Sequence, residues 1–267
     1  TGLADPLRPN APLAIKACHE AGMRVVMITG DYAGTAACIA AEAGLDGEKA
    51  LLTGPELRAM RDDELQQWIG DVSIIARAVP EDKLRIVNAL KANGEVVAMT
   101  GDGVNDAPAL KAAHIGIAMG GRGTDVAREA AGLVLLDDDF SSIVRAVAMG
   151  RRIYDNLKKA TAYIVAIHIP IIGMSVLPLA AGWPLVLYPA HVVLLEMLID
   201  PACAVVFEAE RMEAGAMRRP PRHENEALLS RDILFFSLAQ GISAFVITAL
   251  MFWMALILER GADEARA

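Results

Sequence analysis

TGDGVNDAPALK, residues 100–111, is the most informative stretch of this sequence. A short, continuously apolar run at residues 96–100 leads into it and is typical of a buried strand, while residues 106–112 have the composition of a helix. Gly101 and Gly103 permit a tight turn between the two. The stretch therefore predicts a strand that ends in a sharp loop and is followed at once by a helix.

The loop brings acidic and amide side chains to the carboxyl end of that strand. Asp102 comes directly after the strand, and Asp106 lies near the start of the helix with Asn105 beside it. Oxygen-rich groups of this kind suit a hard cation such as Mg²⁺, which keeps waters and phosphate oxygens among its ligands. The simpler interpretation is an Asx-rich turn that caps a helix. The length of the ordered motif argues against that interpretation.

Around this loop, short apolar runs alternate with Ala-rich amphipathic segments. The predicted strands are residues 23–28, 72–76, 96–100, 115–119 and 133–136, and the predicted helices are residues 34–43, 55–69, 81–92 and 106–112. Continuous apolarity favours parallel strands that are covered on both faces. We therefore expect a doubly wound α/β domain over residues 1–153, with its ligands at the carboxyl ends of the strands.

Two more polar motifs follow predicted strands of this domain. Thr29, Gly30 and Asp31 end the first strand, where a threonine hydroxyl and turn N–H groups can hold a phosphoryl oxygen. Arg77 and Lys83 follow another strand, and Lys83 can neutralise phosphate charge. Each motif alone is also compatible with an ordinary turn or a solvated lysine. Their meeting at one edge of the sheet would indicate a phosphate site.

Beyond residue 156 the composition becomes that of a membrane protein. Residues 160–182 contain no Asp, Glu, Lys or Arg, and residues 185–207 and 233–258 are two further apolar stretches long enough to cross a bilayer. We expect a membrane domain over residues 154–267 with three transmembrane helices. Buried helices in a soluble bundle are the alternative, but three such stretches are hard to bury in that way.

Basic residues indicate the orientation of these helices. They precede the first apolar stretch and fill the segment between the second and third, whereas the link at residues 181–184 has none. The positive-inside tendency then places the α/β domain and the segment 211–231 in the cytoplasm. We expect an integral protein of the lipid bilayer, located in the plasma membrane.

Composition excludes several other classes. A formal net charge of -8, without an aromatic and basic stripe, indicates no nucleic-acid partner. Cys18, Cys38 and Cys203 show no paired spacing, which argues against a disulfide framework or a zinc site. The sequence begins without Met and without a signal pattern. We therefore expect it to be part of a longer protein.

Together, TGDGVNDAPALK, ITGD at residues 28–31 and ARAVPEDK at residues 76–83 resemble the haloacid-dehalogenase-like phosphotransferases. Within that fold they resemble the P-type cation-transporting ATPases, in the branch of the calcium and cation pumps. DPLR at residues 5–8 resembles the DPxR signature of that family. The resemblance implies ATP-driven cation transport through a phosphoaspartyl intermediate, with Mg²⁺ and ATP as cofactors.

The resemblance also implies roles for individual residues. It assigns Mg²⁺ binding to Asp102 and Asp106, which together with Lys83 and Thr29 would form the catalytic group. Contacts with phosphate or nucleotide fall to a larger set: Thr29, Gly30, Asp31, Arg77, Lys83 and Asn105.

The Asp-Lys-Thr-Gly-Thr run that holds the family's nucleophile does not occur in this sequence. The nucleotide-binding and actuator domains are also outside it. We expect the remaining domains of the parent pump to supply these parts, and the chain alone to be inactive. One alternative is a non-catalytic, membrane-anchored, phosphotransferase-like regulatory protein. Another is a soluble haloacid-dehalogenase-like phosphatase, which would need its own Asp-x-Asp motif and no membrane spans.

Two acidic residues lie within the second apolar stretch. Glu196 and Asp200 are four residues apart and so share one helical face. Carboxylates at such depth are costly and usually functional. Pro201 would weaken the helix there and free backbone carbonyls as further ligands. These two acids are therefore candidate ligands of the transported cation.

The family comparison bears on which ion they bind. The corresponding helix of the family carries Asn-x-x-x-Asp, and in calcium pumps the neighbouring helix offers an Asn and a Glu where this chain has His168 and Ile171. Oxygen-rich ligation favours Ca²⁺ or another hard divalent cation such as Mn²⁺. His168 either borders the ion site or makes a hydrogen bond between helices. Cys203 with His168 would instead suit a softer metal.

Overall fold

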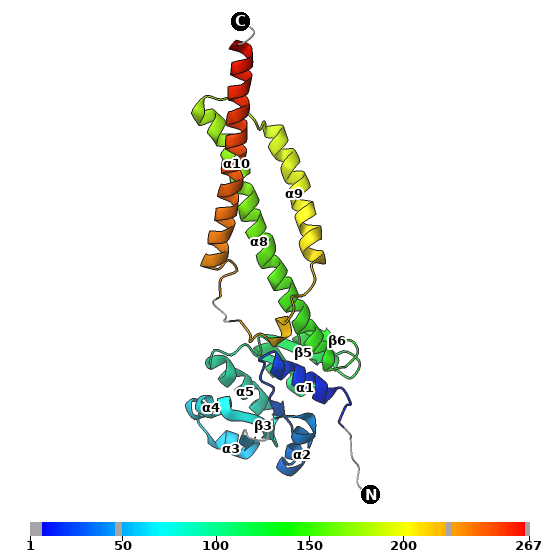
Figure 1. Ribbon diagram of the computed structural model, residues 1–267. Helices are drawn as coiled ribbons and strands as arrows, with labels where there is room; N and C mark the ends of the chain where they lie inside the picture. The colour runs from blue at the N-terminus through cyan, green and yellow to red at the C-terminus, as the bar shows by residue number, and fades with distance from the viewer. Residues whose placement is uncertain (1–6, 46–49, 223–225, 265–267) are drawn as a thin grey trace. The chain divides into compact units, whose positions relative to one another are not determined.

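The computed structural model describes residues 7–45, 50–222 and 226–264, with the backbone alone given for residues 260–264. The predicted DPLR signature begins at Asp5 and Pro6, which lie outside the described residues. The chain divides into two compact units (Figure 1). One comprises residues 1–148 and 215–224, and the other comprises residues 149–214 and 225–267. Residues 215–224 therefore belong to the first unit although they lie between the second and third apolar stretches.

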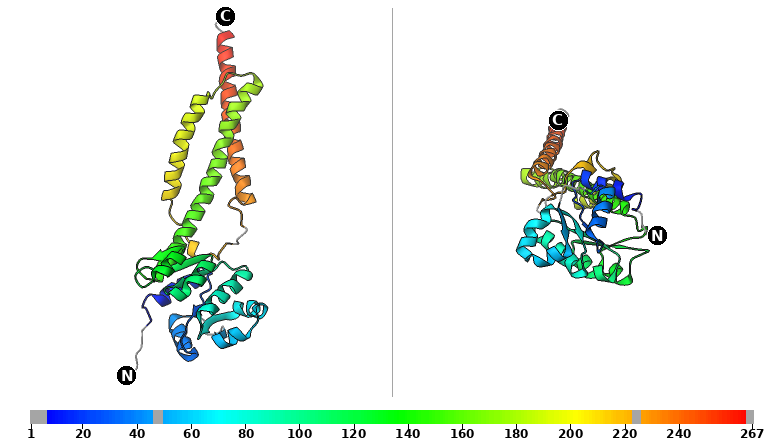
Figure 2. Two further views of the ribbon diagram at one scale, coloured as in Figure 1. Left: turned by 180° about the vertical axis from the view of Figure 1, so that it is seen from behind. Right: turned by 90° about the horizontal axis from the view of Figure 1, so that it is seen from below.

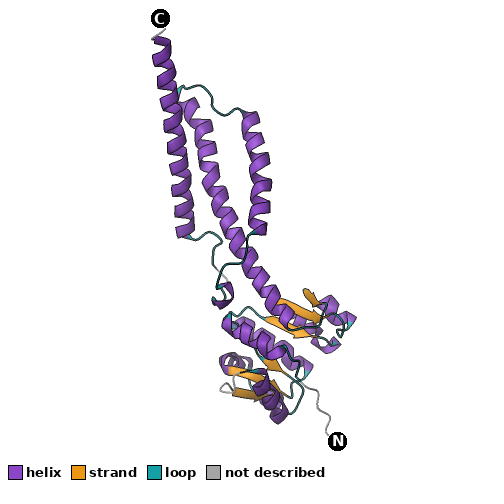
Figure 3. Ribbon diagram, turned by 45° about the vertical axis from the view of Figure 1, so that its right-hand side comes forward, coloured by secondary structure: helices purple, strands orange, loops and turns teal. Residues whose placement is uncertain are grey.

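The described residues of the first unit form an α/β structure with six short parallel strands. They are β1 (Met27–Ile28), β2 (Ala50–Thr53), β3 (Val72–Ala76), β4 (Ala98–Gly101), β5 (Ile115–Met119) and β6 (Leu133–Leu135). They form two sheets, with the strand orders β1-β3-β2 and β4-β5-β6. Figure 3 shows the two groups of strands in orange. Parallel strands joined by helices confirm the predicted fold class. The strands do not, however, form one continuous sheet, because β1 and β4 are not paired with each other.

Helices cover both faces of these strands. They are α1 (Ala11–Glu20), α2 (Ala33–Ala43), α3 (Gly54–Ala59), α4 (Asp62–Trp68), α5 (Pro80–Ala92), α6 (Ala107–Ala112) and α7 (Asp125–Ala130). One hydrophobic core joins α5 to both sheets, because Ile75 of β3, Leu90 of α5 and Met99 of β4 belong to the same cluster. A second core packs α1 and α2 against the other face of β3, through side chains such as Ile15, Ala40 and Ile74.

Some predicted elements of this unit differ from the structure: the strand expected at residues 23–28, for example, is limited to Met27–Ile28 in β1. Residues 55–69 were expected to be one helix, but α3 ends at Ala59 and α4 begins at Asp62. The break has a tertiary cause, because the Arg85 guanidinium of α5 donates to the carbonyl oxygens of Leu57 and Met60, at 2.7 and 2.5 Å. Three elements were not predicted: α1, α7 and β2, which forms by pairing with β3.

The second unit contains long apolar helices. α8 (Ser141–Ala181), α9 (Pro189–Ala209) and α10 (Arg231–Glu264) each contain a stretch apolar and long enough to cross a membrane. The first apolar stretch was expected to begin at residue 160, but α8 starts within the α/β unit and runs without interruption for 41 residues. The helix ends at Gly182, whose positive φ of 67° suits glycine, and the Trp183 N–H donates to the Pro178 carbonyl oxygen at 2.8 Å.

Small residues let α8 and α10 approach closely, as both views of Figure 2 show. Pro170 has no N–H to donate to the Ala166 carbonyl oxygen one turn earlier in α8. Gly241 of α10 lies against that same oxygen, and a Cβ at position 241 would be 2.6 Å from it. The proline that leaves a carbonyl unpaired in one helix is thus matched by a glycine in the next.

Candidate phosphate and cation sites

The loop after β4 is organised by Asp106, which is only 5% exposed. Its Oδ2 atom accepts the N–H groups of Asp102 and Gly103 at 3.3 and 3.1 Å. Gly101 is required at the neighbouring position, because a Cβ there would be 2.5 Å from the Cβ atom of Asp106. The Asp106 carboxylate therefore folds the loop back on itself and fixes the backbone of Asp102.

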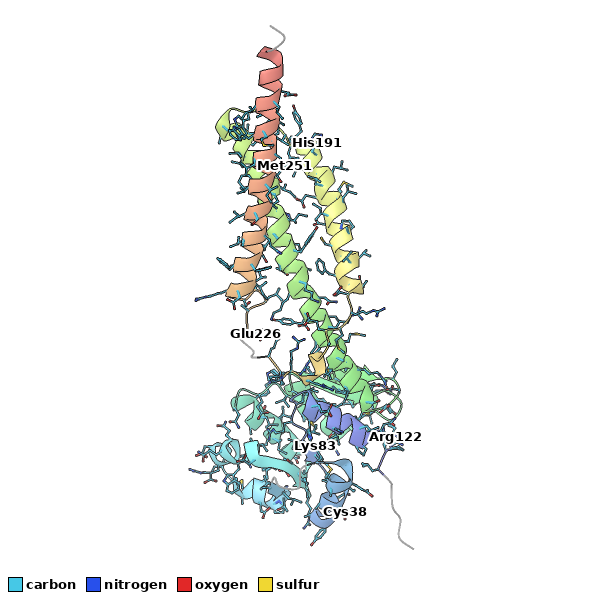
Figure 4. All side chains as sticks on the ribbon, in the orientation of Figure 1. Cys38, Lys83, Arg122, His191, Glu226 and Met251 are labelled. Atoms are coloured by element: carbon cyan, nitrogen blue, oxygen red, sulfur yellow. The ribbon has the colours of Figure 1, made fainter. Side chains whose placement is uncertain are left out.

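Lys83 of α5 completes this arrangement. Its Nζ atom lies 2.5 Å from Asp106 Oδ1, and its side chain is 24% exposed (labelled in Figure 4). Both oxygens of Asp106 are consequently occupied by donors of the protein itself. The carboxylate of Asp102, in contrast, is exposed at the carboxyl end of β4.

The different surroundings of Asp102 and Asp106 determine how this loop could bind Mg²⁺. The ion commonly binds through one or two carboxylates, with waters and phosphate oxygens as the other ligands. Asp102 offers such a carboxylate, and Asp106 holds it in place through the backbone. Among the described side chains, no cluster of three or more His, Cys, Asp or Glu could hold a metal on its own. The site therefore fits a magnesium ion that arrives with a phosphate group.

The loop after β1 forms a second polar group at the same type of strand end. The Thr29 hydroxyl donates to Asp31 Oδ2 at 2.8 Å and accepts the Asp31 N–H at 3.1 Å. Backbone bonds join this loop to the end of β3, since the Arg77 N–H donates to the Asp31 carbonyl and the Ala78 N–H donates to the Thr29 carbonyl, both at 3.0 Å. Gly30, between the two bonded residues, is exposed.

Arg77 has an unusual backbone with a φ of 55°. Gly54 at the start of α3 makes room for it, because a Cβ at that glycine would be 2.2 Å from the Arg77 carbonyl oxygen. The strained residue comes directly after β3, and its side chain is exposed there. The structure thus links the predicted residues in two groups. Backbone hydrogen bonds join the loop of Thr29 and Asp31 to Arg77 and the residue after it. The Asp106 carboxylate joins the other group, because it pairs with Lys83 and accepts the Asp102 N–H. Asn105 is exposed within that loop.

A buried acid that the sequence analysis missed supports Lys83. Asp82 is 2% exposed, and its Oδ2 atom accepts the Val79 N–H at 2.9 Å and pairs with Arg58 at 2.5 Å. These bonds fix the first turn of α5, from which Lys83 projects. An Asp at the third position of a helix that begins with Pro80 is a capping signal that could have revealed it.

Serine hydroxyls hold two acids after β6 in their ionised form. The hydrogen bond from Ser142 lowers the pKa of Asp137 below its ordinary value of 3.8, and that from Ser141 does the same for the pKa of Asp139. Each hydroxyl donates to its carboxylate at 2.6 Å. A pKa that is lower in the folded chain stabilises the fold above the unfolded value, and this contribution is lost as the pH falls through the folded value.

We therefore expect the segment from β6 to the start of α8 to lose protection from amide hydrogen exchange as the pH falls below roughly 4. The double variant Ser141→Ala, Ser142→Ala should show a flatter pH dependence, because its two carboxylates lose these donors. Ser243→Ala is the matched control, since its hydroxyl donates only to the Ala239 carbonyl. An unchanged pH profile in the double variant would contradict the assignment.

In the second unit, the predicted ion-site residues do not all meet. His168 Nε2 of α8 lies 3.4 Å from Glu196 Oε1 of α9, and His168 Nδ1 lies 2.8 Å from the Ile164 carbonyl oxygen. A carbonyl only accepts, so Nδ1 is the donor of this hydrogen bond. Asp200 is exposed.

Two further positions of this region were singled out from the sequence, Ile171 and Pro201. Ile171, which stands where calcium pumps have a carboxylate, is buried at 9% exposure. α9 continues through Pro201 as far as Ala209, so the proline does not end the helix. Pro201 nevertheless has no N–H for the carbonyl of Met197, which lies between the two acids in sequence.

Side chains of α8 cap the carboxyl end of α9. Arg152 donates to the carbonyl oxygens of Glu208 and Glu210, each at 2.8 Å, and Asn156 donates to that of Glu210 at 3.1 Å. Lys159 Nζ lies 3.5 Å from Glu210 Oε1. The last carbonyls of a helix have no partners within it. This end of α9 is therefore held by three residues of one face of α8.

Comparisons with known proteins identify both halves of the chain. Residues 1–114 match the haloacid dehalogenase-like hydrolases, and residues 184–267 match the carboxyl-terminal region of cation transporting ATPases. The chain is 40% identical over 253 residues to a calcium-transporting ATPase of Bacillus subtilis. It is 42% identical over 271 residues to a probable cation-transporting ATPase F of Mycobacterium tuberculosis.

A third relative is calcium-transporting ATPase 1 of Saccharomyces cerevisiae, which is 39% identical over 254 residues. The three alignments cover 94%, 99% and 94% of this chain. They cover 28%, 30% and 27% of the respective relatives. The chain therefore spans less than a third of the length of each.

Proposed function

We propose that this chain, which belongs to the P-type cation-transporting ATPases, is the carboxyl-terminal part of an ATP-driven cation pump that works through a phosphoaspartyl intermediate. The proposal assigns ATP and Mg²⁺ to the α/β unit and a transported cation to the apolar helices. The nucleophilic aspartate would come from another part of the parent pump, because no Asp-Lys-Thr-Gly-Thr run occurs in this sequence.

In this proposal, Asp102 binds Mg²⁺, and Asp106 positions it without touching the ion. When bound, Mg²⁺ would withdraw charge from the phosphoryl oxygens. Lys83 and Arg77 place positive charge beside the transferred group, and the Thr29 hydroxyl and the Gly30 N–H group hold its oxygens. The chain would thus bind and orient the phosphate while another segment forms the bond.

One observation carries this assignment: Asp106 has both oxygens engaged, whereas Asp102, held by its loop, is exposed. In the parent pump, Asp102→Asn should therefore reduce phosphoenzyme formation from radioactive ATP by roughly 100-fold or more, and raise the Mg²⁺ concentration required. Asp125→Asn is a suitable control, because Asp125 is an exposed acid on α7 that pairs with Arg128. A normal Mg²⁺ dependence in Asp102→Asn would refute the role.

For the transported ion, we propose that Glu196 and Asp200 are ligands and that His168 borders the site. Carboxylate and carbonyl oxygens favour Ca²⁺ or another hard divalent cation. The two carboxylates share one helical face and repel each other in a low-dielectric setting, so at least one of them would bind a proton when the cation leaves. Cation movement would then be coupled to proton movement in the opposite direction.

We also propose that α8, α9 and α10 span the plasma membrane with the α/β unit in the cytoplasm. Support comes from the apolar length of the three helices and from the basic residues that flank them. In a cysteine-free background, a cysteine at Gly182 should react with an impermeant maleimide added to intact cells. A cysteine at Arg218 should react only after the cells are opened. Labelling at position 218 from outside would overturn this topology.

A further inference from the structure

The hydrogen-bond ladder between β4 and β5 is closed at its amino end by a side chain. The two strands are parallel, and the Ile115 N–H donates to the Val97 carbonyl at 3.1 Å. Both backbone groups of a strand residue turn toward the same neighbouring strand, so the Val97 N–H also points toward β5. Its partner is the Nδ1 atom of His114, at 3.0 Å.

The imidazole occupies the position that a backbone carbonyl would normally hold. In a parallel ladder, the Val97 N–H would donate to the carbonyl two residues before Ile115, which is that of Ala113. Ala113 is instead the residue that ends α6, and its N–H donates to the Ala109 carbonyl at 3.0 Å. The side chain of His114 therefore replaces a carbonyl that β5 does not supply.

The bond to His114 reaches into the core of the α/β unit. Val97 is buried at 8% exposure and belongs to the same hydrophobic cluster as Ile75 and Met99. His114 itself is exposed to solvent. A buried N–H that loses its acceptor is costly, because water does not readily replace the lost partner. The state of an exposed ring thus bears directly on a buried strand end.

The bond requires one protonation state of His114. A backbone N–H can only donate, so Nδ1 is the unprotonated nitrogen and the neutral ring carries its proton on Nε2. A protonated imidazole has a donor on each nitrogen and no acceptor. A proton on Nδ1 would therefore place two donors against each other and break the bond to Val97.

Charged groups of the neighbouring segments surround this end of the ladder. The carboxyl ends of α5, α6 and α7 and the segment before β4 contribute Lys91, Lys111, Glu129 and Glu95. Lys91 Nζ donates to the Ala112 carbonyl at 2.6 Å, and Glu95 pairs with Arg24 at 2.8 Å. Histidine is the side chain that ordinarily changes its charge between pH 5 and 8, and among these groups that residue is His114.

We propose that His114 is a proton-sensitive cap of the β4–β5 ladder. The neutral ring holds the amino end of β4, and protonation of the ring releases it. β4 ends at Gly101 and leads directly into Asp102, so the strand that loosens is the one that carries the phosphate-site loop. The α/β unit would thereby respond to acidification through a residue that lies outside that site.

The test follows amide hydrogen exchange of the full chain in lipid nanodiscs between pH 8 and pH 5. Rates are expressed as protection factors, which remove the pH dependence of intrinsic exchange. We expect the protection of the Val97 amide to fall by roughly 10-fold or more over this range, because a buried donor loses its acceptor. The amide of Ile75 in β3 should keep its protection, since β3 has no bond to His114.

Three variants separate the effect of the proton from other effects. His114→Gln retains a side-chain acceptor that does not titrate, so the protection of Val97 should no longer change with pH. His114→Phe retains a ring without an acceptor and should show low protection of Val97 at every pH. His19→Gln is the matched control, because His19 lies exposed on α1, and it should keep the wild-type pH profile.

The tautomer of His114 gives an independent readout. Its ¹⁵N chemical shifts, assigned by comparison with His114→Gln, should show a proton on Nε2 and none on Nδ1 at pH 8. A proton on Nδ1 at that pH would overturn the proposal. The same holds if Val97 protection in the wild type is independent of pH, keeps its pH dependence in His114→Gln, or falls together with that of Ile75. None of these measurements requires ATP or a transported cation, so they are independent of the proposed function.

Discussion

Lys83→Met in the parent pump should lower the rate of phosphoenzyme formation by roughly 100- to 1,000-fold, the usual cost of removing one preorganised group that stabilises developing charge. Lys83 is the cation of α5 that pairs with the buried Asp106 at 2.5 Å. The same change leaves the buried Asp106 carboxylate without its cation. Loss of one partner of a buried pair typically costs about 3–5 kcal/mol of folding free energy, and the partial exposure of Lys83 should bring the cost to the lower end.

A double variant separates the catalytic effect from the structural one. Lys83→Met with Asp106→Asn removes both charges and should recover much of the lost stability, measured as the unfolding midpoint in denaturant. Phosphorylation should stay as low as in Lys83→Met. Recovery of phosphorylation together with stability would show that Lys83 acts only through the fold.

Glu196→Gln should raise the cation concentration for half-maximal phosphorylation of the parent pump by roughly 10- to 100-fold, as is typical when a metal site loses one of its supporting groups. The change also removes one of the two carboxylates that are proposed to bind a proton when the cation leaves, and this carboxylate lies 3.4 Å from His168 Nε2. The cation response of this variant should consequently depend less on pH than that of the wild type. The measurement is phosphorylation across a panel of divalent cations at several pH values.

Asp200→Asn belongs in the same experiment, because Asp200 is the second proposed ligand and is exposed. Glu208→Gln is the control on the same helix, since Glu208 is exposed and uses its backbone carbonyl to accept from Arg152. If Glu196→Gln and Asp200→Asn both keep the wild-type cation response, these acids serve helix packing instead of transport.

Sequence patterns predicted the elements whose cause is local. β3 and β5 were predicted at their observed bounds, because a continuous apolar run needs only burial to become a strand. The break between α3 and α4 could not be predicted, because it depends on carbonyls captured by Arg85 from a helix that comes later in the chain. β2 is four residues long and owes its conformation to pairing with β3.

The site shows the same division. The spacing of the motif placed both Asp102 and Asp106 in one loop. It did not show which of the two carboxylates is free to bind a metal ion. That depends on Lys83, 23 residues from Asp106 in sequence, and on the backbone of the turn. Asp82 was missed because its importance comes from burial beside Arg58, which a sequence does not display.

The cap on α9 limits how that helix can move. Arg152 and Asn156 hold the carbonyls at its carboxyl end, so sliding along the helix axis would break these bonds while a swing about that end would preserve them. At 1.5 Å per residue along the helix axis, Glu196 lies about 18 Å and Asp200 about 12 Å from Glu208. A swing of about 5° would therefore displace Glu196 by about 1.6 Å and Asp200 by about 1 Å. The two acids would then move by different distances relative to His168. A small rotation of α9 would therefore change the geometry of the proposed cation ligands.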